Sequence, residues 1–354
     1  MRPTSGIVPI VLLGLLVGCH DLPTEDASNS EEILFGRGGN KPPKDPPGGG
    51  SADPAIAFVD DGTLMVMNAD GSEKTSLVDG VSRGVSWSPY GNRVAYSAGT
   101  IAVAELSLSN GVPVVANVVD LNLPHPGAPA WSPLGDLIAY AGGCDPGEPD
   151  GTCPPEGYLN HLRAVPATGG AAFTMYEAPD CPNPWDCLIS GGPTWKSDGS
   201  QIAFVEARGD GWNVHSLQVV DVAAAPTQVS QPLIGPGELA FICNPAWSPD
   251  DSTIAFWGRE TSSGVASLFV FDVAAGASTN LGLTSRYGCE DLSWSPDGTR
   301  WVVSLDGAIR IVDADPGSPT YGQVIPRSKS KLAVGYGPDW RRCEAGTTGC
   351  GLAP

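Results

Sequence analysis

The sequence predicts an all-β protein, and three observations carry this prediction. The chain of 354 residues contains 46 Gly and 34 Pro, and only 16% of its residues are charged, a composition that favours short strands joined by turns. A hairpin-like motif recurs five times, as in "VSWSPYGNRVAYSAG" (85–99) and "LSWSPDGTRWVVSLDG" (292–307). Incomplete copies of the same repeat stand at the two ends of this region, which predicts that the repeats close into a ring.

Each motif is predicted to be a β-hairpin whose first strand ends in tryptophan. These Trp residues stand at positions 87, 131, 195, 247 and 294, and seven residues after each of them an apolar run begins. The intervening Ser-Pro-Asp-Gly, or a variant of it, suits a tight turn, because Pro presets φ, Asp bonds its own backbone and Gly takes the left-handed position. The fixed length sets the register, and a Trp side chain is large enough to wedge between neighbouring sheets.

A third strand and a weaker fourth strand follow each hairpin. Third strands are predicted at "IAVAEL" (from 101), "HLRAVPA" (161), "SLQVVDV" (216), "SLFVFDV" (267) and "AIRIVDA" (308). Four strands per repeat of about 45 residues are typical of a β-propeller. Residues 55–78 supply only strands two to four, whereas "VGYGPDWRR", with Trp340, supplies only a first strand. We therefore expect a six-bladed propeller over residues 53–342, closed by the C-terminal strand.

The N-terminus is predicted to be a lipoprotein signal peptide, residues 1–18. Arg2 precedes an apolar run that is too short to span a bilayer comfortably, and the run ends in Leu16-Val17-Gly18-Cys19. This ending resembles a bacterial lipobox, which implies cleavage before Cys19 and lipidation of that residue. An ordinary secretory signal with a chance cysteine is the alternative.

Residues 19–52 are predicted to form a disordered tether between the lipid and the propeller. They are rich in Pro, Gly, Ser and charge, and a segment of that composition cannot bury enough apolar area to fold. We expect an exported protein that is anchored to the cell envelope on its periplasmic or surface side, with no membrane contact besides the lipid. By analogy with enteric lipoproteins, the lack of Asp directly after Cys19 suggests the outer membrane.

The net charge of −20 excludes one class of partner. An acidic surface repels phosphate backbones, so we expect no nucleic acid as a ligand. The same acidity helps to keep an extracytoplasmic protein soluble.

The eight cysteines that remain after Cys19 suit disulfides in an oxidising compartment. Three pairs are close in the sequence: Cys144 with Cys153, Cys181 with Cys187, and Cys343 with Cys350 in a C-terminal tail of residues 343–354. Cys243 and Cys289 remain, and each stands just ahead of the inner strand of its blade. Since those two blades are consecutive, we expect a disulfide between them.

No metal or other cofactor is expected. The sequence contains no tight Cys/His cluster with the spacing of a zinc site. The loop "GGCDPGEPDGTC" (142–153) offers Asp145, Glu148 and Asp150, and clustered carboxylates can hold Ca²⁺. Their spacing lacks the alternating ligands of a known calcium loop, so a plain disulfide-stapled loop is favoured.

The repeats resemble those of the TolB-type six-bladed β-propeller, a WD40-like PD40 repeat. The W-S-P-D-G hairpins, the "IAF" second strands at 56, 202 and 254, and "VMNADGS" at 66–72 carry the resemblance, which covers about residues 53–342. It implies the propeller fold and an interaction module of the envelope. TolB itself belongs to the periplasmic Tol–Pal system and has a further N-terminal α/β domain, whereas here a tether precedes the propeller.

We expect a binding module for an envelope protein, with a glycan as the alternative ligand. The candidate ligand-binding residues stand just upstream of inner strands and should ring the channel mouth opposite the hairpins: Arg83, His125, Asn244, Glu290 and Tyr336. The alternative is that they only solvate the mouth.

The rival class is an enzyme of the polysaccharide lyase or glycosidase type, or a carbohydrate-binding protein, that uses the channel mouth. The sequence has no G-x-S-x-G nucleophile motif, and His125, His161 and His215 are widely spaced. No residue is therefore assigned a catalytic role.

Overall fold

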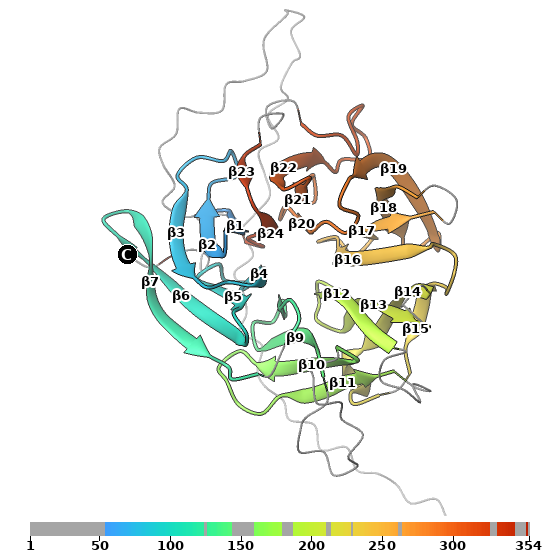
Figure 1. Cartoon of the computed structure of the whole chain (residues 1–354), viewed down its shortest axis with the longest axis horizontal. Coiled ribbons are helices and arrows are strands. Elements are labelled where there is room, and N and C mark those ends of the chain that lie inside the picture. Colours follow the sequence, from blue (N-terminus) through green and yellow to red (C-terminus); the bar gives the residue numbers. More distant parts are fainter. Residues whose placement is uncertain are drawn as a thin grey trace, which may run out of the picture. The chain divides into compact units, whose positions relative to one another are not determined.

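The computed structural model describes residues 54–123, 126–143, 159–178, 187–209, 214–227, 229–260, 264–325, 331–343 and 352. In these residues, six four-stranded antiparallel sheets surround a central channel as the blades of a propeller (Figure 1). The last strand, β24, pairs with the first, β1, and completes blade 1. The predicted six-bladed propeller, with closure by the C-terminal strand, is confirmed.

Each blade runs from an inner strand at the channel to an outer strand at the rim. Blade 1 contains β24 (Tyr336–Trp340), β1 (Ile56–Asp60), β2 (Thr63–Met67) and β3 (Thr75–Asp79). Blade 2 contains β4 (Arg83–Trp87), β5 (Arg93–Ser97), β6 (Ile101–Ser109) and β7 (Val112–Asp120). Blade 3 contains β8 (Ala130–Trp131), β9 (Leu137–Gly142), β10 (His161–Pro166) and β11 (Phe173–Glu177).

The other three blades repeat this order. Blade 4 contains β12 (Cys187–Trp195), β13 (Gln201–Arg208), β14 (Val214–Asp221) and β15 (Gln231–Ile234). Blade 5 contains β16 (Phe241–Trp247), β17 (Thr253–Arg259), β18 (Ala266–Asp272) and β19 (Ala277–Ser285). Blade 6 contains β20 (Leu292–Trp294), β21 (Arg300–Leu305), β22 (Ala308–Asp313) and β23 (Ala333–Val334).

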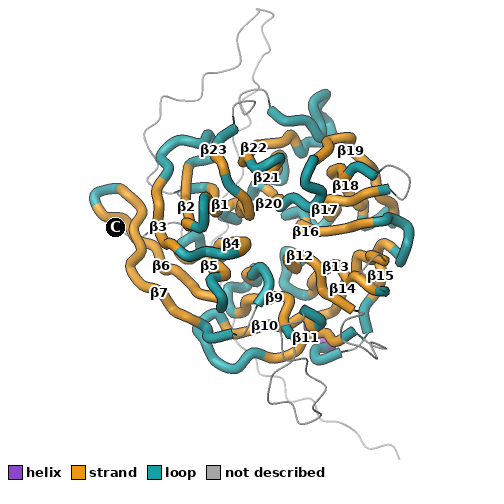
Figure 2. Tube along the Cα trace, in the orientation of Figure 1, coloured by secondary structure: helices purple, strands orange, loops and turns teal. Residues whose placement is uncertain are grey.

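Helix is almost absent from the described part of the chain (Figure 2). In the residues described, one 3₁₀ turn, η2 (Val222–Ala224), follows β14. Within the described ranges, no helix has both the length and the apolar character needed to cross a membrane.

The hairpin register is the same in every blade. Each motif Trp at the end of an inner strand pairs with the residue seven positions later, as in Trp87 with Val94 and Trp195 with Ile202. Trp340 pairs with Ile56, so the closing pair has the same place in blade 1 although it joins the two ends of the propeller. The fixed turn length therefore sets the register, as the sequence predicts.

The turns use the predicted residue chemistry. The carboxylate of Asp250 accepts hydrogen bonds from the hydroxyl of Ser248 at 2.6 Å and from the backbone N–H of Ser252 at 3.1 Å. These bonds, led by that from the Ser248 hydroxyl, lower the pKa of Asp250. Gly298 takes the left-handed position in its turn with a φ of 70°, and Asp251 takes the equivalent position in its own turn with a φ of 61°.

Asp251 replaces the expected glycine because its side chain joins two hairpins. Its carboxylate accepts hydrogen bonds from the backbone N–H and the hydroxyl of Ser197, both at 2.7 Å. Asp is one of the residue types that tolerate the left-handed conformation, so the link between blades 4 and 5 is compatible with the turn.

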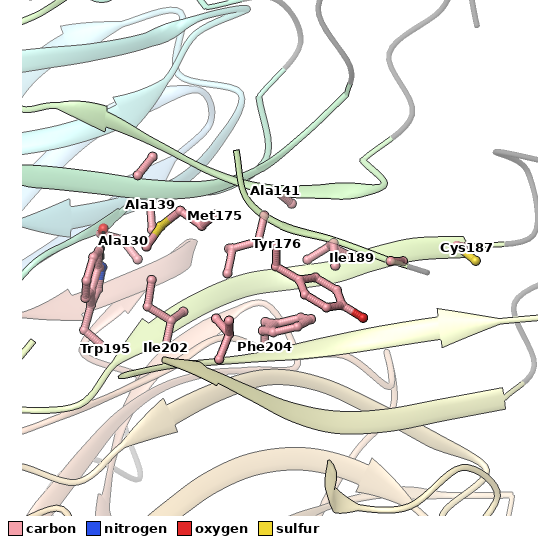
Figure 3. Packing of buried hydrophobic residues seen from close by; sticks show 14 residues of the cluster. Ala130, Ala139, Ala141, Met175, Tyr176, Cys187, Ile189, Trp195, Ile202 and Phe204 are labelled. Atoms are coloured by element: carbon pink, nitrogen blue, oxygen red, sulfur yellow. Dashed lines mark hydrogen bonds between the residues drawn. The ribbon is translucent and has the colours of Figure 1, made fainter. Parts of the chain in front are cut away.

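One apolar cluster fills each of the six interfaces between blades. Strand alternation divides the side chains, so that Ala57 and Val59 of β1 face blade 2 while Ile56 and Phe58 face blade 6. Figure 3 shows the interface of blades 3 and 4, where Trp195 lies against Ala130 and Ala139 of the preceding blade. The tryptophans therefore pack sheet on sheet, as predicted.

The predicted bond between blades 5 and 6 is present. A disulfide joins Cys243 to Cys289, with their Cα atoms 5.9 Å apart. Cys187 and Cys343 also belong to disulfides. Their predicted partners, Cys181 and Cys350, lie outside the described residues, as do Cys144, Cys153 and Cys19.

Candidate functional site

The central channel is the candidate site, and the common register of the inner strands builds it. It holds a cavity of about 390 Å³. All six blades line this cavity with residues that stand at the same offsets in the sequence from the Trp of their inner strand. Three levels have one residue from every blade. The loop-face level lies three residues before each Trp: Gly84, Ala128, Gly192, Asn244, Asp291 and Gly337. The middle level lies one residue before: Ser86, Ala130, Thr194, Ala246, Ser293 and Asp339. The hairpin level lies two residues after: Pro89, Pro133, Ser197, Pro249, Pro296 and Arg342.

Middle-level side chains connect neighbouring blades. The hydroxyls of Ser86, Thr194 and Ser293 each accept a hydrogen bond from the backbone N–H of the Trp in the next blade, at 2.9, 3.0 and 3.1 Å. Asp339 does the same for Trp87 at 2.7 Å. The channel wall is therefore held by polar contacts that run from blade to blade.

Alanine occupies the two remaining middle-level positions, and a different bond replaces the missing acceptor. There the indole Nε1–H of the next Trp donates to the alanine carbonyl, from Trp195 to Ala130 at 2.9 Å and from Trp294 to Ala246 at 3.0 Å. All six interfaces thus carry a hydrogen bond at this level, and these bonds link the blades into a continuous ring around the channel.

The loop-face level joins blades 4, 5, 6 and 1. The side-chain oxygen of Asn244 accepts from the N–H of Gly192 at 3.3 Å, and its Nδ2 donates to Oδ1 of Asp291 at 2.8 Å. The N–H of Gly337 donates to Oδ2 of Asp291 at 3.0 Å. Both oxygens of this carboxylate are therefore occupied at the channel wall.

Blades 1 and 2 approach each other closely at the same level. A Cβ at Gly337, whose φ is 59°, would lie 3.1 Å from the Cα of Gly84. Glycine is needed there because of both the left-handed backbone and the close contact.

The channel has two unlike walls. Blades 5, 6 and 1 contribute its charged groups and most of its other polar side chains, whereas blades 2, 3 and 4 contribute mainly glycine, alanine and proline. The described residues that line the cavity include three charged side chains, Asp291, Asp339 and Arg342. A ligand in the channel would meet a polar surface on one side and a small, apolar surface on the other.

Enclosure by protein changes the ionisation of these carboxyl groups. It raises the pKa of Asp291 to about 6, and the nearby charge of Glu290 adds to the rise while the Gly337 N–H opposes it. It also raises the pKa of Asp339, against the hydrogen bond from Ser293 and the charge of Arg342. Both side chains keep partial access to water through the channel.

Arg342 differs from the two aspartates, because its side chain is exposed to the channel although protein surrounds it. Desolvation lowers the pKa of the guanidinium, and the charge of Asp339 opposes this effect. An arginine remains protonated at neutral pH, so Arg342 places a positive charge at the hairpin level.

The sequence-predicted site residues have different positions. Asn244 lines the channel at the loop-face level, and Tyr336, with 38% of its surface exposed, begins β24 one position further from its Trp. The backbone of Arg83 begins β4, and His125 lies outside the described residues. The structure brings Asn244 and Glu290 together, since Asn244 Nδ2 donates to the carbonyl oxygen of Glu290 at 3.1 Å.

The carboxylate of Glu290 is turned into its own blade. It is 5% exposed and accepts hydrogen bonds from Ser285 Oγ at 2.6 Å, from the N–H of Asp306 at 3.0 Å and from Ser304 Oγ at 3.2 Å. These contacts give the side chain a structural role at the start of β20.

The sequence-predicted site residues do not include Asp291, Asp339 and Arg342, although Asp291 precedes its Trp by three residues, as Asn244 does. The signal that identifies them is their offset in the sequence from Trp294 or Trp340, since residues at the same offsets line the channel in every blade.

The described residues contain no group of three or more His, Cys, Asp or Glu side chains that could hold a metal ion. The carboxylates Asp145, Glu148 and Asp150, considered above for Ca²⁺, lie outside the described residues.

Comparison with known proteins gives matches at the level of structure. No model of a known protein family matches the chain, and no curated protein matches it. TolB from Acinetobacter baumannii is 18% identical with a TM-score of 0.52, over 82% of this chain and 67% of that chain. A putative TolB from Agrobacterium tumefaciens is 15% identical with a TM-score of 0.54, over 80% and 91%. A chain of a nidogen/laminin complex is 12% identical with a TM-score of 0.55, over 81% and 98%.

At these identities the similarity concerns the fold, and it agrees with the blade count, the ring closure and the hairpin motifs. In its architecture the chain is a TolB-like six-bladed β-propeller.

Proposed function

We propose that this chain is a lipid-anchored binding module of the bacterial cell envelope, and that its channel receives part of a protein partner. The observation that carries the proposal is the preformed channel of about 390 Å³, with one polar and one apolar wall. Ligand sites are concave and largely preformed, with a few placed polar groups on an apolar background. The blade-to-blade hydrogen bonds hold these groups in place before a ligand arrives.

The chemistry of the lining favours binding over catalysis. Among the described lining residues there is no His, Cys, Lys or Tyr, and the hydroxyls of Ser86, Thr194 and Ser293 already accept backbone N–H groups of the next blade. A nucleophile or general base needs an orienting partner and a free reacting atom. The hydroxyl groups of the wall act instead as structural acceptors.

One observation favours an enzyme as the second candidate. Asp291 and Asp339 are two carboxyl groups in one channel, and Asp291 has a pKa of about 6. Glycosidases use pairs of carboxyl groups, one of them with a raised pKa. This candidate requires that the full chain cleaves an isolated envelope polysaccharide and that Asp291→Asn abolishes the cleavage.

Photo-crosslinking in cells tests the binding proposal. A photoreactive phenylalanine analogue replaces Tyr336 at the loop-face end of the channel, and the control places the same analogue at Val112, which is 49% exposed on the outer strand β7. We expect a protease-sensitive adduct of defined mass from position 336 and none from position 112. A protease-resistant adduct would indicate a glycan ligand, and equal adducts from both positions would contradict a channel site.

The envelope location is part of the same proposal and rests on the residues before Cys19. The Cys19→Ser variant should leave the detergent phase and enter the aqueous phase in a phase-separation assay. An unchanged partition would contradict the lipid anchor and leave the channel proposal untouched.

A further inference from the structure

Arg342 breaks the pattern of the hairpin level. Four blades place proline at this position and blade 4 places Ser197, whereas blade 1 places a long cationic side chain. Because β24 ends the propeller, no Ser-Pro-x-Gly turn has to follow it, and the position is free to carry another residue. The guanidinium therefore stands among proline rings at the hairpin mouth of the channel.

Among the described residues, the guanidinium interacts with Asp339 through charge alone. In the described part of the chain, Arg342 forms neither a hydrogen bond nor a salt bridge, although the carboxylate of Asp339 lies on the same wall. The two oxygens of Asp339 are occupied elsewhere, by Ser293 Oγ at 2.6 Å and by the N–H of Trp87 at 2.7 Å. A guanidinium has five N–H donors in a fork that matches a carboxylate, and those of Arg342 are exposed to the channel, where a ligand can reach them.

We propose that Arg342 binds a carboxylate group of a peptide that enters the channel from the hairpin face. This inference rests on the proposed binding function and names the group that the channel recognises. Arg–carboxylate pairs are frequently bidentate, which gives orientation as well as affinity. The aliphatic proline surfaces of blades 2, 3, 5 and 6 offer apolar contacts to the neighbouring part of the peptide.

The charge of the protein restricts the ligand to few negative charges. The chain carries a net charge of −20, and one guanidinium is the cationic group among the described lining residues. The acidic protein would repel a polyanion, whereas a single carboxylate can form an ion pair with Arg342.

The tryptophans of the channel offer a sugar ring little to stack on. Trp195, Trp247 and Trp294 line the cavity. Trp195 and Trp247 are buried between blades, and the half-buried Trp294 packs edge-on against Trp301 and donates its indole N–H to the Ala246 carbonyl. A peptide carboxylate needs no open ring face and therefore suits this lining better than a sugar acid.

The test uses three libraries of random heptapeptides on the immobilised full chain, with retention measured by mass spectrometry. The first lacks Asp and Glu and has a free C-terminal carboxylate, the second has the same sequences with a C-terminal amide, and the third is amidated and contains one Asp. We expect the first or the third library to be retained at least about tenfold more than the second, a factor equivalent to about 1.4 kcal/mol. Which of the two is retained tells a terminal carboxylate from a side-chain carboxylate.

Variants assign the effect to Arg342. Arg342→Gln should remove the preference for the acid and change the melting temperature little, because the side chain forms no hydrogen bond or salt bridge with a described residue. Arg342→Lys should keep only part of the preference. The matched control is Arg286→Gln, since Arg286 is 87% exposed on the surface. Equal retention of all three libraries, or an unchanged preference in Arg342→Gln, overturns the inference.

The outcomes also separate this inference from the proposed function. If acid and amide libraries are retained equally and position 336 still gives a protein adduct in cells, the binding module stands and only the carboxylate recognition is wrong. If no library is retained and no adduct forms, both proposals fail.

Discussion

The carboxylate of Asp339 accepts a hydrogen bond from the backbone N–H of Trp87 at 2.7 Å, although 252 residues separate the two in the sequence. The same carboxylate accepts the hydroxyl of Ser293 at 2.6 Å. One side chain of the closing strand thus connects blades 6, 1 and 2. Closure of the ring depends on this contact as well as on the pairing of β24 with β1.

The variant Asp339→Ala should lower the free energy of unfolding by about 1–3 kcal/mol, because it leaves the Trp87 N–H and the Ser293 hydroxyl without their acceptor. Asp339→Asn should lose less, since one acceptor oxygen remains. Chemical denaturation measures both. Ser197→Ala is the matched control, because it also removes a side-chain hydrogen bond between blades but at an exposed position, and we expect at most about 0.5 kcal/mol. Equal losses for Asp339→Ala and Ser197→Ala would contradict the closing role of Asp339.

The Trp340→Ala variant tests the apolar part of the closure. Trp340 is 6% exposed and packs with Val302, Ile309 and Ile311 of blade 6, so its removal should cost roughly 3–5 kcal/mol. Trp294 holds the same place at the interface of blades 5 and 6 but is only half-buried, and Trp294→Ala should cost less. If Trp340→Ala and a deletion of residues 333–342 both melt like the parent, the closed ring is wrong.

Stability should depend on pH through Asp291. Its pKa of about 6 in the folded state exceeds the value of about 3.9 for an unfolded chain, so folding favours the protonated form. This contribution is fully present below about pH 4 and is lost as the pH rises through about 6. The difference corresponds to at most about 3 kcal/mol, and channel water reduces it to roughly 1–2 kcal/mol.

Urea denaturation at pH 4.5 and pH 7.5 measures this effect. The parent should gain stability towards acid over this range, and Asp291→Asn should flatten the slope whatever its absolute stability. Asp250→Asn is the control, because the lowered pKa of Asp250 contributes stability that is lost only at more acidic pH. A slope that persists unchanged in Asp291→Asn would refute the assignment.

The Cys243–Cys289 disulfide should stabilise the ring between blades 5 and 6. It closes a loop with a sequence separation of 46, which corresponds to about 3–4 kcal/mol on the loop-entropy view. Alanine at both positions should lower the melting temperature under non-reducing conditions and abolish the cross-linked peptide in peptide mapping. Retention of the parent stability would show that this bond contributes little.

Much of the fold could be predicted because its determinants are local and repeated. The seven-residue offset from Trp to its partner fixes each hairpin, and the incomplete repeats at 55–78 and around Trp340 predict the closure. The structure was needed only to explain why some repeats depart from the motif. Asp251 carries the left-handed turn position because its carboxylate bonds Ser197 of the neighbouring hairpin, which the sequence of one repeat does not reveal.

The site was harder to predict, because exposure depends on contacts between blades. Glu290 lies four residues before Trp294 and Asn244 three before Trp247. Ser285 of blade 5 and Ser304 and Asp306 of blade 6 hold the Glu290 carboxylate, while Asn244 faces the channel. Arg342 follows β24 like any tail residue, and only the alignment of all six inner strands places it in the cavity.

Amide hydrogen exchange of the full chain, with and without a peptide from the retained library, tests the central claim that the ligand occupies the channel. The account predicts slower exchange in the inner strands β4, β8, β12, β16, β20 and β24 and in the hairpin turns that follow them, with the outer strands unchanged. Protection confined to outer strands such as β7 or β19, with unchanged exchange along the channel, would contradict it.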